Sequence, residues 1–348
     1  MSSLCVTARN EAVQILKLTT WIASSFLLAM TRSVSHYLIN DCKSTKFVSL
    51  QHNQSTMQDN LFIEDLKQST GMRGFLFLII LLISSLIGIV LSRVFIAAGD
   101  TGMRIAQGLS SLFMFVVPPV VYYFITRKVR PMHGLGFRSL AHPWWLIFLG
   151  VAVMFVSIPF TSQLTLWNEN MSFGSAFAKL EAYLKSMEET ARAATEKMLN
   201  VDTFGGLLLN LLIIALIPAL GEEMTFRGVL QQSLTRKMNP HVSIWLSAAI
   251  FSFIHFQFYG FLPRMFLGVL LGYMFHITGS LWTSIAMHFV NNGTAVMLYY
   301  LNNKGILDVD VEHFGALENP WFVGLSAVVT AGLIAWSCRE GRPKHLPE

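Results

Sequence analysis

Charged residues are scarce in this sequence, and their scarcity excludes most soluble folds. Only 13% of the 348 residues are Asp, Glu, Lys or Arg, whereas 53% are hydrophobic. A soluble domain usually carries about 25% charged residues. The apolar residues also form long runs, as in chains that face lipid. The composition therefore predicts an integral membrane protein, and a net charge of only +5 gives no indication of a nucleic-acid partner.

Cysteine is also rare and occurs without a functional spacing. Cys5, Cys42 and Cys338 form no zinc pattern, redox pair or disulfide framework, which argues against a disulfide-built fold and against a cysteine nucleophile. The sequence also lacks the Gly-x-Ser-Gly of rhomboid-like serine proteases, a His-Glu-x-x-His zinc helix and paired aspartates in its apolar segments. These absences weigh against the other known classes of intramembrane protease.

Eight apolar segments are long enough to cross a bilayer as helices, which takes roughly 20 residues. They lie at 74–91, 105–126, 144–161, 204–221, 242–258, 261–277, 280–300 and 321–337. We therefore expect an all-α fold, a polytopic membrane bundle of about eight transmembrane helices. The segment 173–199 is instead charged with one apolar stripe, so it is expected to lie across the outer mouth of the bundle. It is either a lid or substrate gate or a plain amphipathic connector.

Lys and Arg favour the cytoplasmic side of a membrane, and their clusters predict the orientation. The clusters comprise Arg127, Lys128, Arg130, Arg138, Arg236, Lys237, Arg339, Arg342 and Lys344. Eight spans with both termini in the cytoplasm satisfy all of them, although Arg93, Arg104 and Arg264 then lie at the outer ends of spans.

Residues 1–56 differ from the rest of the chain. They have mixed polarity and contain one apolar patch, Trp21–Met30, that is short for a span. Either this stretch is signal-like or the natural start is Met57. We expect a doubtful N-terminal extension at 1–56 and a single integral-membrane domain at 57–348, with its motif core at 204–300.

Ionisable residues within apolar segments are costly and usually functional. The densest group is Glu222 and Glu223, followed by Arg227. On a helix Glu223 and Arg227 share a face and can form an ion pair. Glu222 points about 100° away from Glu223 and lacks that partner. Two carboxylates in different environments are typical of acid–base chemistry, whereas the alternative is an ordinary charge cluster where a helix leaves the membrane.

Two further apolar segments contain polar residues. His255 lies inside the predicted span 242–258, and His288 and Asn292 share a helical face in the span 280–300. Each can be structural when taken singly, as a satisfied buried histidine or a helix–helix hydrogen bond. Residue counting also places Glu222 near the cytoplasmic face and His255 nearer the outer one, so the two meet only if the span boundaries differ.

Together these residues are the groups that a water-activating hydrolase needs. Glu222 can take the proton of a water, while the histidines and Asn292 orient the water and stabilise the oxyanion. Alternatively, Glu222, His255 and His288 hold a divalent metal such as zinc that acidifies its water.

The three motifs resemble those of the CAAX-processing and bacteriocin-processing (CPBP or Abi) intramembrane proteases. That family has Glu-Glu-x-x-x-Arg, then Phe-x-x-x-His, then His-x-x-x-Asn on successive helices. The matching residues here are Glu222, Glu223, Arg227, Phe251, His255, His288 and Asn292.

The resemblance implies a helical membrane fold with a polar cavity open to the cytoplasm, in a bacterial inner membrane. It makes Glu222 the general base, lets His255 share the water or a metal, and gives His288 and Asn292 the oxyanion. The glutamate–arginine pair would be structural. The partners would be the bilayer and a membrane-embedded or lipid-associated peptide or protein, which in eukaryotic relatives is a prenylated C-terminal peptide.

A non-catalytic membrane protein is the alternative to the endopeptidase. It could be a proton-coupled transporter that uses Glu222 and the histidines as a relay, although the sequence lacks the internal repeat common in transporters. It could also be a family member with a peptide-binding, immunity or scaffolding role.

Overall fold

The fold was analysed in a computed structural model, which describes residues 70–96, 98–126, 131–137 and 144–340. These described residues belong to one compact unit. The predicted extension at 1–56 and the candidate start Met57 lie outside the described residues.

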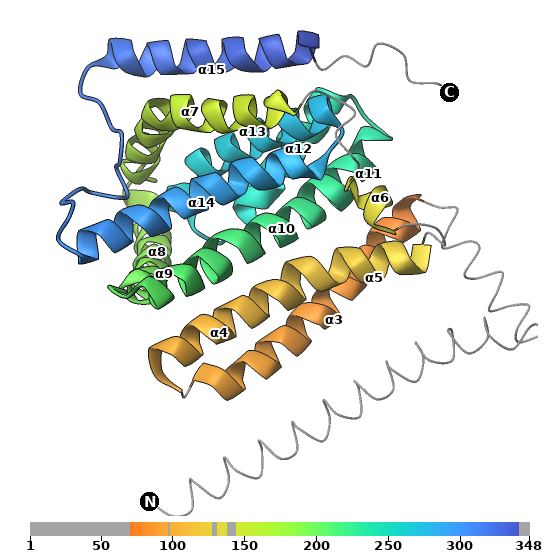
Figure 1. Cartoon of the computed structure of the whole chain (residues 1–348), viewed down its shortest axis with the longest axis horizontal. Coiled ribbons are helices and arrows are strands. Elements are labelled where there is room, and N and C mark those ends of the chain that lie inside the picture. Colours follow the sequence, from red (N-terminus) through yellow and green to blue (C-terminus); the bar gives the residue numbers. More distant parts are fainter. Residues whose placement is uncertain (1–69, 97, 127–130, 138–143, 341–348) are drawn as a thin grey trace, which may run out of the picture. The chain divides into compact units, whose positions relative to one another are not determined.

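All the regular elements of the described residues are helices (Figure 1). The α-helices are α3 (Thr70–Ile96), α4 (Gly99–Ser111), α5 (Val117–Thr126), α6 (Pro131–Leu135), α7 (Trp145–Glu169), α8 (Ala178–Leu199), α9 (Phe204–Asn210), α10 (Ile217–Glu223), α11 (Gln232–Thr235), α12 (Pro240–Phe253), α13 (Phe261–Thr278), α14 (Leu281–Asn303) and α15 (Pro320–Glu340). The π-helices are η1 (Leu112–Val116), η3 (Leu211–Leu216) and η4 (Met224–Gln231), and the 3₁₀ turns are η2 (Ser175–Phe177) and η5 (Phe258–Gly260).

Among the described residues, six helices are long and apolar enough to cross a membrane, where the sequence predicted about eight spans. The six are Gly71–Ile96, Gly99–Thr126, Trp145–Glu169, Phe204–Thr235, Phe258–Thr278 and Pro320–Arg339. The predicted span 242–258 is the 14-residue α12, which is too short to cross alone. The predicted span 280–300 is the 23-residue α14, whose sequence includes polar residues such as His288 and Asn292. A helix lies at each of the eight predicted positions, and the predicted all-α, polytopic membrane fold is confirmed.

The outer helices present apolar side chains on their exposed faces, as contact with lipid requires. On α3, Leu82 is 61% exposed, and on α15, Val328 is 70% exposed. A water-soluble helix would carry polar residues at such positions. These surfaces support the conclusion that the chain is an integral, multi-pass membrane protein.

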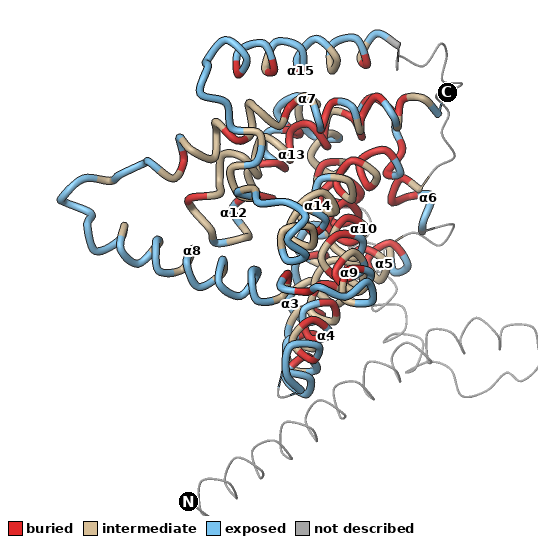
Figure 2. Tube along the Cα trace, turned by 60° about the vertical axis from the view of Figure 1, so that its left-hand side comes forward, coloured by how far each residue is buried: buried red, intermediate tan, exposed pale blue. Residues whose placement is uncertain are grey.

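The central helical run extends from Phe204 to Thr235 and joins α9, η3, α10, η4 and α11. The predicted span 204–221 was too short, because its end was placed at the charged residues. Those residues are inside the protein: positions 221–229 are all buried, and Figure 2 shows buried positions gathered along α10. Glu222 consequently lies near the middle of the run.

Close helix contacts hold this run in place. A Cβ at Gly221 would lie 2.8 Å from Cβ of Phe115 in η1, so only glycine permits this approach. Helices α12 and α13 form a similarly close pair, because a Cβ at Gly268 would lie 2.9 Å from Cβ of Ala248. Helix α7 packs against α13, α14 and α15 (Figure 1).

The connection between α14 and α15 is fastened by His313. Its Nε2 lies 2.9 Å from Oε2 of Glu169 at the end of α7, and its Nδ1 lies 2.7 Å from Oδ2 of Asp310. Next to it, Glu312 forms an ion pair with Arg192 of α8 at 3.1 Å. Hydrogen bonds to Glu169 and then Asp310 raise the pKa of His313 above its ordinary value.

We expect the stabilisation that His313 supplies to be lost in alkaline solution. Because the folded pKa is raised above the unfolded value, the contribution is complete below about pH 6.5 and disappears as the pH rises through the folded pKa. Thermal unfolding in detergent between pH 6 and 9 should show wild type losing stability relative to His313→Gln. Parallel curves for the two proteins would contradict this role.

Candidate active site

The predicted ion pair between Glu223 and Arg227 forms and is completely buried. Nη1 of Arg227 donates to Oε1 of Glu223 at 2.8 Å, and the two side chains are 2% and 0% exposed. The pair lies where α10 passes into the π-helix η4. Such π segments occur often at functional sites.

Arg227 also joins the central run to α12 and α13. Its Nη2 donates to the carbonyl oxygen of Gly268 at 2.8 Å. Its guanidinium carbon lies 5.1 Å from the centroid of the Phe251 ring, within the range of a cation–π interaction. One charged side chain therefore contacts three elements of the core.

Glu223 has a second role that its predicted structural pairing did not include. Its Oε1 also accepts the Nδ1 hydrogen of His288 from α14 at 2.8 Å. With Nδ1 donating, Nε2 of a neutral imidazole is left to accept a proton. That Nε2 lies 3.8 Å from Oε2 of Glu222, which is too far for a direct hydrogen bond but suited to a bridging water.

His255 does not lie inside a span, contrary to the prediction. Helix α12 ends at Phe253, and His255 occupies the turn that follows. Its Nδ1 hydrogen donates to the carbonyl oxygen of Phe251 at 2.8 Å, which fixes the ring. The chain then reverses at Phe256, which has a φ of 53°. A bulky residue with positive φ is strained, and such strain is concentrated at functional sites.

The Phe251 ring brings the two histidines together. Its centroid lies 5.1 Å from that of His255 and 6.1 Å from that of His288. Glu222 and His288 are also close enough to His255 to interact with it electrostatically. The structure thus gathers Glu222, His255 and His288, and their apparent separation in depth came from wrong span boundaries.

Asn292 lies one helical turn after His288 on α14 and faces the central run. Its amide nitrogen donates to the carbonyl oxygen of Ile214 at 3.4 Å, and its Oδ1 accepts from Asn291 at 3.1 Å. An amide nitrogen carries two hydrogens, so this bond to Ile214 uses one of them.

Two residues of the site had no predicted role in it. Phe251 belonged to the recognised motif but had no assigned function, and the structure makes it the platform for Arg227 and both histidines. Arg264 of α13 interacts electrostatically with Glu222 and His255, although the sequence marked it only as a charge that disagreed with the orientation. A charge in an apolar segment was the signal available for Arg264.

Comparison with known proteins agrees with this geometry. Residues 204–294 match the family model described as type II CAAX prenyl endopeptidase Rce1-like. An uncharacterized Bacillus subtilis (strain 168) protein, YpbD, is 32% identical over 85 residues, which are 23% of this chain and 41% of YpbD. The match therefore spans less than half the length of that relative. No solved structure matches the chain significantly.

Residues 204–294 are thus similar to the Rce1-like endopeptidases. This finding confirms the predicted resemblance to the CPBP proteases over the segment that was matched. The matched segment runs from α9 into α14 and contains all seven motif residues. Helices α3–α8 and α15 lie outside it, so the site comes from the matched segment while the remaining helices surround that segment.

The sequence left open a metal site at Glu222, His255 and His288. Among the described residues, no group of three His, Cys, Asp or Glu side chains is arranged to hold a metal ion. Glu222, His255 and His288 gather without forming such a set, and zinc at these residues stays a prediction.

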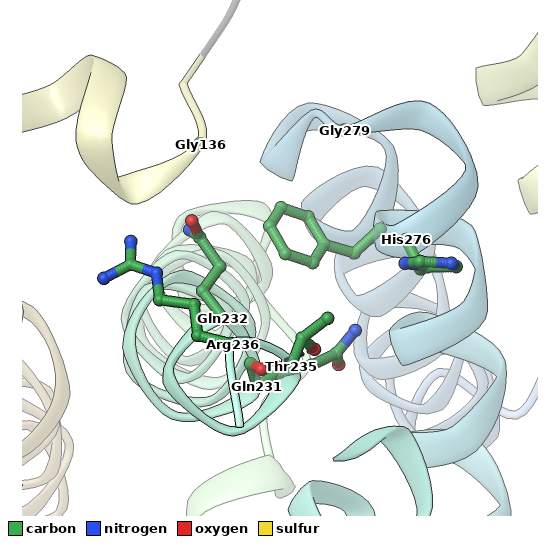
Figure 3. Close-up of a pocket in the computed structure, with 8 residues that line it drawn as sticks. Gly136, Gln231, Gln232, Thr235, Arg236, His276 and Gly279 are labelled. Atoms are coloured by element: carbon green, nitrogen blue, oxygen red, sulfur yellow. Dashed lines mark hydrogen bonds between the residues drawn. The ribbon is translucent and has the colours of Figure 1, made fainter. Parts of the chain in front are cut away.

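A cavity of about 290 Å³ lies elsewhere, towards the C-terminal ends of the central run and α13 (Figure 3). Its lining comprises Gly136, Gln231, Gln232, Thr235, Arg236, Phe275, His276 and Gly279. Gln231 is more than two helical turns beyond Glu222. The motif residues do not line this cavity, so it is separate from the candidate active site.

We expect Glu223→Gln to destabilise the protein by about 3–5 kcal/mol, because it leaves Arg227 buried without its charge partner. Unfolding in detergent and denaturant measures the effect. The pair Arg192–Glu196 on α8 is the control, since it has the same i,i+4 spacing at 3.0 Å but its side chains are 51% and 46% exposed. Glu196→Gln should leave stability almost unchanged. Similar losses at both positions would show that burial does not control the Glu223–Arg227 interaction.

Proposed function

We propose that this protein is an intramembrane endopeptidase that hydrolyses a peptide bond with a water activated by Glu222. The observation that carries the proposal is the 3.8 Å separation between Oε2 of Glu222 and Nε2 of His288, with His288 oriented by Glu223. A nucleophilic water needs an acceptor for its proton and a second group that fixes its position. These two atoms provide both at a spacing that one water can bridge.

The proposed reaction begins when Glu222 takes a proton from the water as the oxygen attacks the peptide carbonyl. Glu222 can then pass that proton to the departing amine, so the same carboxylate serves as base and acid. Glu223 holds His288 in one tautomer, as an orienting carboxylate does in a catalytic triad. Arg227 in turn fixes Glu223, which explains why a charge pair is buried here.

The negative charge on the carbonyl oxygen requires hydrogen-bond donors. We assign this role to Asn292, and we place His255 beside the attacking water. The family resemblance assigns it also to His288, which donates through Nε2 only when its imidazole is protonated. The free amide hydrogen of Asn292 and the fixed ring of His255 support these assignments. Donors already in position stabilise an oxyanion without a reorganisation cost.

The proposed substrate is a membrane-embedded or lipid-associated peptide or protein. The site is built inside a bundle whose outer helices are apolar, so a substrate held at the membrane reaches it most directly. The family description names a CAAX prenyl endopeptidase, and a substrate with a lipidated C-terminus is consistent with that description.

Cleavage by purified protein tests this function. In bicelles, wild type should cut members of a peptide library, and Glu222→Gln should lower the rate by at least about a thousandfold, since a lost base removes most water activation. Glu189→Gln on the exposed side of α8 is the control and should retain full activity. Equal cleavage by Glu222→Gln and wild type would refute the role of Glu222, and no cleavage by wild type would favour the peptide-binding alternative.

Chelation tests the metal prediction in the same assay. A metal-free mechanism predicts that wild-type activity is unchanged after dialysis against a chelator. Loss of activity that zinc restores would instead assign Glu222, His255 and His288 to a metal ion.

We also propose a bacterial inner membrane with both termini in the cytoplasm, on the basis of the Lys and Arg clusters. In this orientation α8 lies outside, because it follows the third predicted span. Glu188 of α8 accepts the backbone N–H of Tyr259 at 3.2 Å, close to the site. Access would then come from the outer side, whereas the family resemblance implies a cytoplasmic opening.

Cysteine labelling in intact cells distinguishes these two expectations. In a background with all three native cysteines replaced by serine, Glu189→Cys and Lys237→Cys place single thiols at exposed positions. An impermeant maleimide should label Glu189→Cys and should reach Lys237→Cys only after the cells are opened. The reverse pattern would overturn the proposed orientation and support cytoplasmic access.

A further inference from the structure

Arg264 is a charged residue within an apolar segment, and its partners do not neutralise it. It lies in the first turn of α13 and its side chain is 23% exposed. Its Nη1 donates to the carbonyl oxygen of Gln257 at 3.1 Å, and its Nη2 donates to Oε1 of the same residue at 2.8 Å. Both acceptors are neutral, so these bonds position the guanidinium without balancing its charge.

Glu188 of α8 is the carboxylate paired with Arg264, and the pairing is loose. Its Oε1 lies 3.9 Å from Nη2 of Arg264, beyond hydrogen-bond distance. Burial raises the pKa of Glu188, although Arg264 and the Tyr259 N–H act in the opposite direction. Its Oε2 is occupied by that N–H at 3.2 Å. Glu188 is therefore a poorly matched partner for a guanidinium that binds carboxylates best in a two-pronged geometry.

Arg264 lies beside the turn that carries His255, because Gln257, which accepts both of its hydrogen bonds, is only two residues after His255. It also lies below α8, which is held over this region by Glu188 and by Lys185, whose Nζ is 5.6 Å from the centroid of the Tyr259 ring. A substrate that approaches Glu222 beneath α8 must pass this guanidinium.

We propose that Arg264 is a specificity residue that binds a carboxylate of the substrate, and that Glu188 occupies this position until the substrate displaces it. The proposal rests on the function proposed above. In this proposal α8 is a lid, and the substrate opens it by replacing Glu188 at Arg264. The segment 173–199 is then a substrate gate and not a plain amphipathic connector.

The chemistry favours a carboxylate over a phosphate. Glu188 and Glu222 both lie near Arg264, and two negative groups disfavour a doubly charged ligand there. A single planar carboxylate matches the guanidinium and replaces a group of its own kind. It can be the C-terminus of the substrate or an Asp or Glu side chain near the scissile bond.

Peptide binding to the Glu222→Gln protein tests the proposal separately from catalysis. The probe is a fluorescent library of apolar eight-residue peptides in bicelles, prepared as free acids, as C-terminal amides and as amides with one internal Asp. The free acids should bind more tightly than the amides by roughly tenfold to a hundredfold, the range for hydrogen bonds to a charged group. Adding Arg264→Gln should abolish that preference while amide binding is retained.

Two further variants guard against a folding defect at Arg264. Glu188→Gln keeps an acceptor for the Tyr259 N–H but removes the competing charge, so it should tighten binding of free acids and leave amides unchanged. Glu189→Gln, its exposed neighbour, should change neither. Arg264→Lys retains the positive charge but loses the two-pronged guanidinium geometry, so it should keep only part of the preference for free acids over amides.

The possible outcomes distinguish failure of the proposed Arg264 site from failure of the proposed endopeptidase function. A preference only for the Asp-containing amides would support Arg264 and assign the carboxylate to a side chain. Equal binding of all three forms, or a preference that survives Arg264→Gln, would overturn the proposal while leaving the endopeptidase function intact. If Glu222→Gln cleaved peptides like wild type, the proposed function would fail whatever the binding result.

Discussion

The buried ion pair between Glu223 and Arg227 is the interaction on which the rest of the site depends. A charge in a membrane interior is tolerated only with a partner, and here each partner has additional contacts. Arg227 binds the carbonyl of Gly268 and faces the ring of Phe251, while Glu223 holds His288. Helices α12, α13 and α14 are thereby placed around Glu222 by one pair of charges. The pair therefore positions the groups for which catalytic roles are proposed.

Glu222 and Glu223 have different surroundings because they occupy adjacent positions on a helix. Neighbouring residues point in different directions, so one carboxylate faces Arg227 and the other faces the site. The sequence predicted this asymmetry because it depends only on local helix geometry and on the position of Arg227. The bond from Glu223 to His288 joins residues 65 positions apart and depends on how α14 packs, so no local pattern could reveal it.

The helical membrane fold could be predicted because long apolar runs are a strong signal. The ends of the spans could not, since window hydropathy does not show whether charges such as Glu222 and Arg227 end a helix or lie inside the bundle. The same ambiguity displaced His255 into a span, whereas α12 stops before it. The candidate site residues could be picked out because polar side chains are rare in such segments. Phe251 and Arg264 escaped assignment because their roles depend on neighbours from other helices.

The shortness of α12 has a consequence for hydration. Fourteen residues span about 21 Å, whereas a bilayer core is about 30 Å thick. If α12 follows the membrane normal, at least one of its ends therefore lies at a depth where lipid cannot satisfy backbone hydrogen bonds. Irregular backbone is tolerated there only where protein encloses it or water reaches it. The turn that holds His255 follows one of these ends and is partly exposed, so it is a place where the fold can admit water for the proposed hydrolysis.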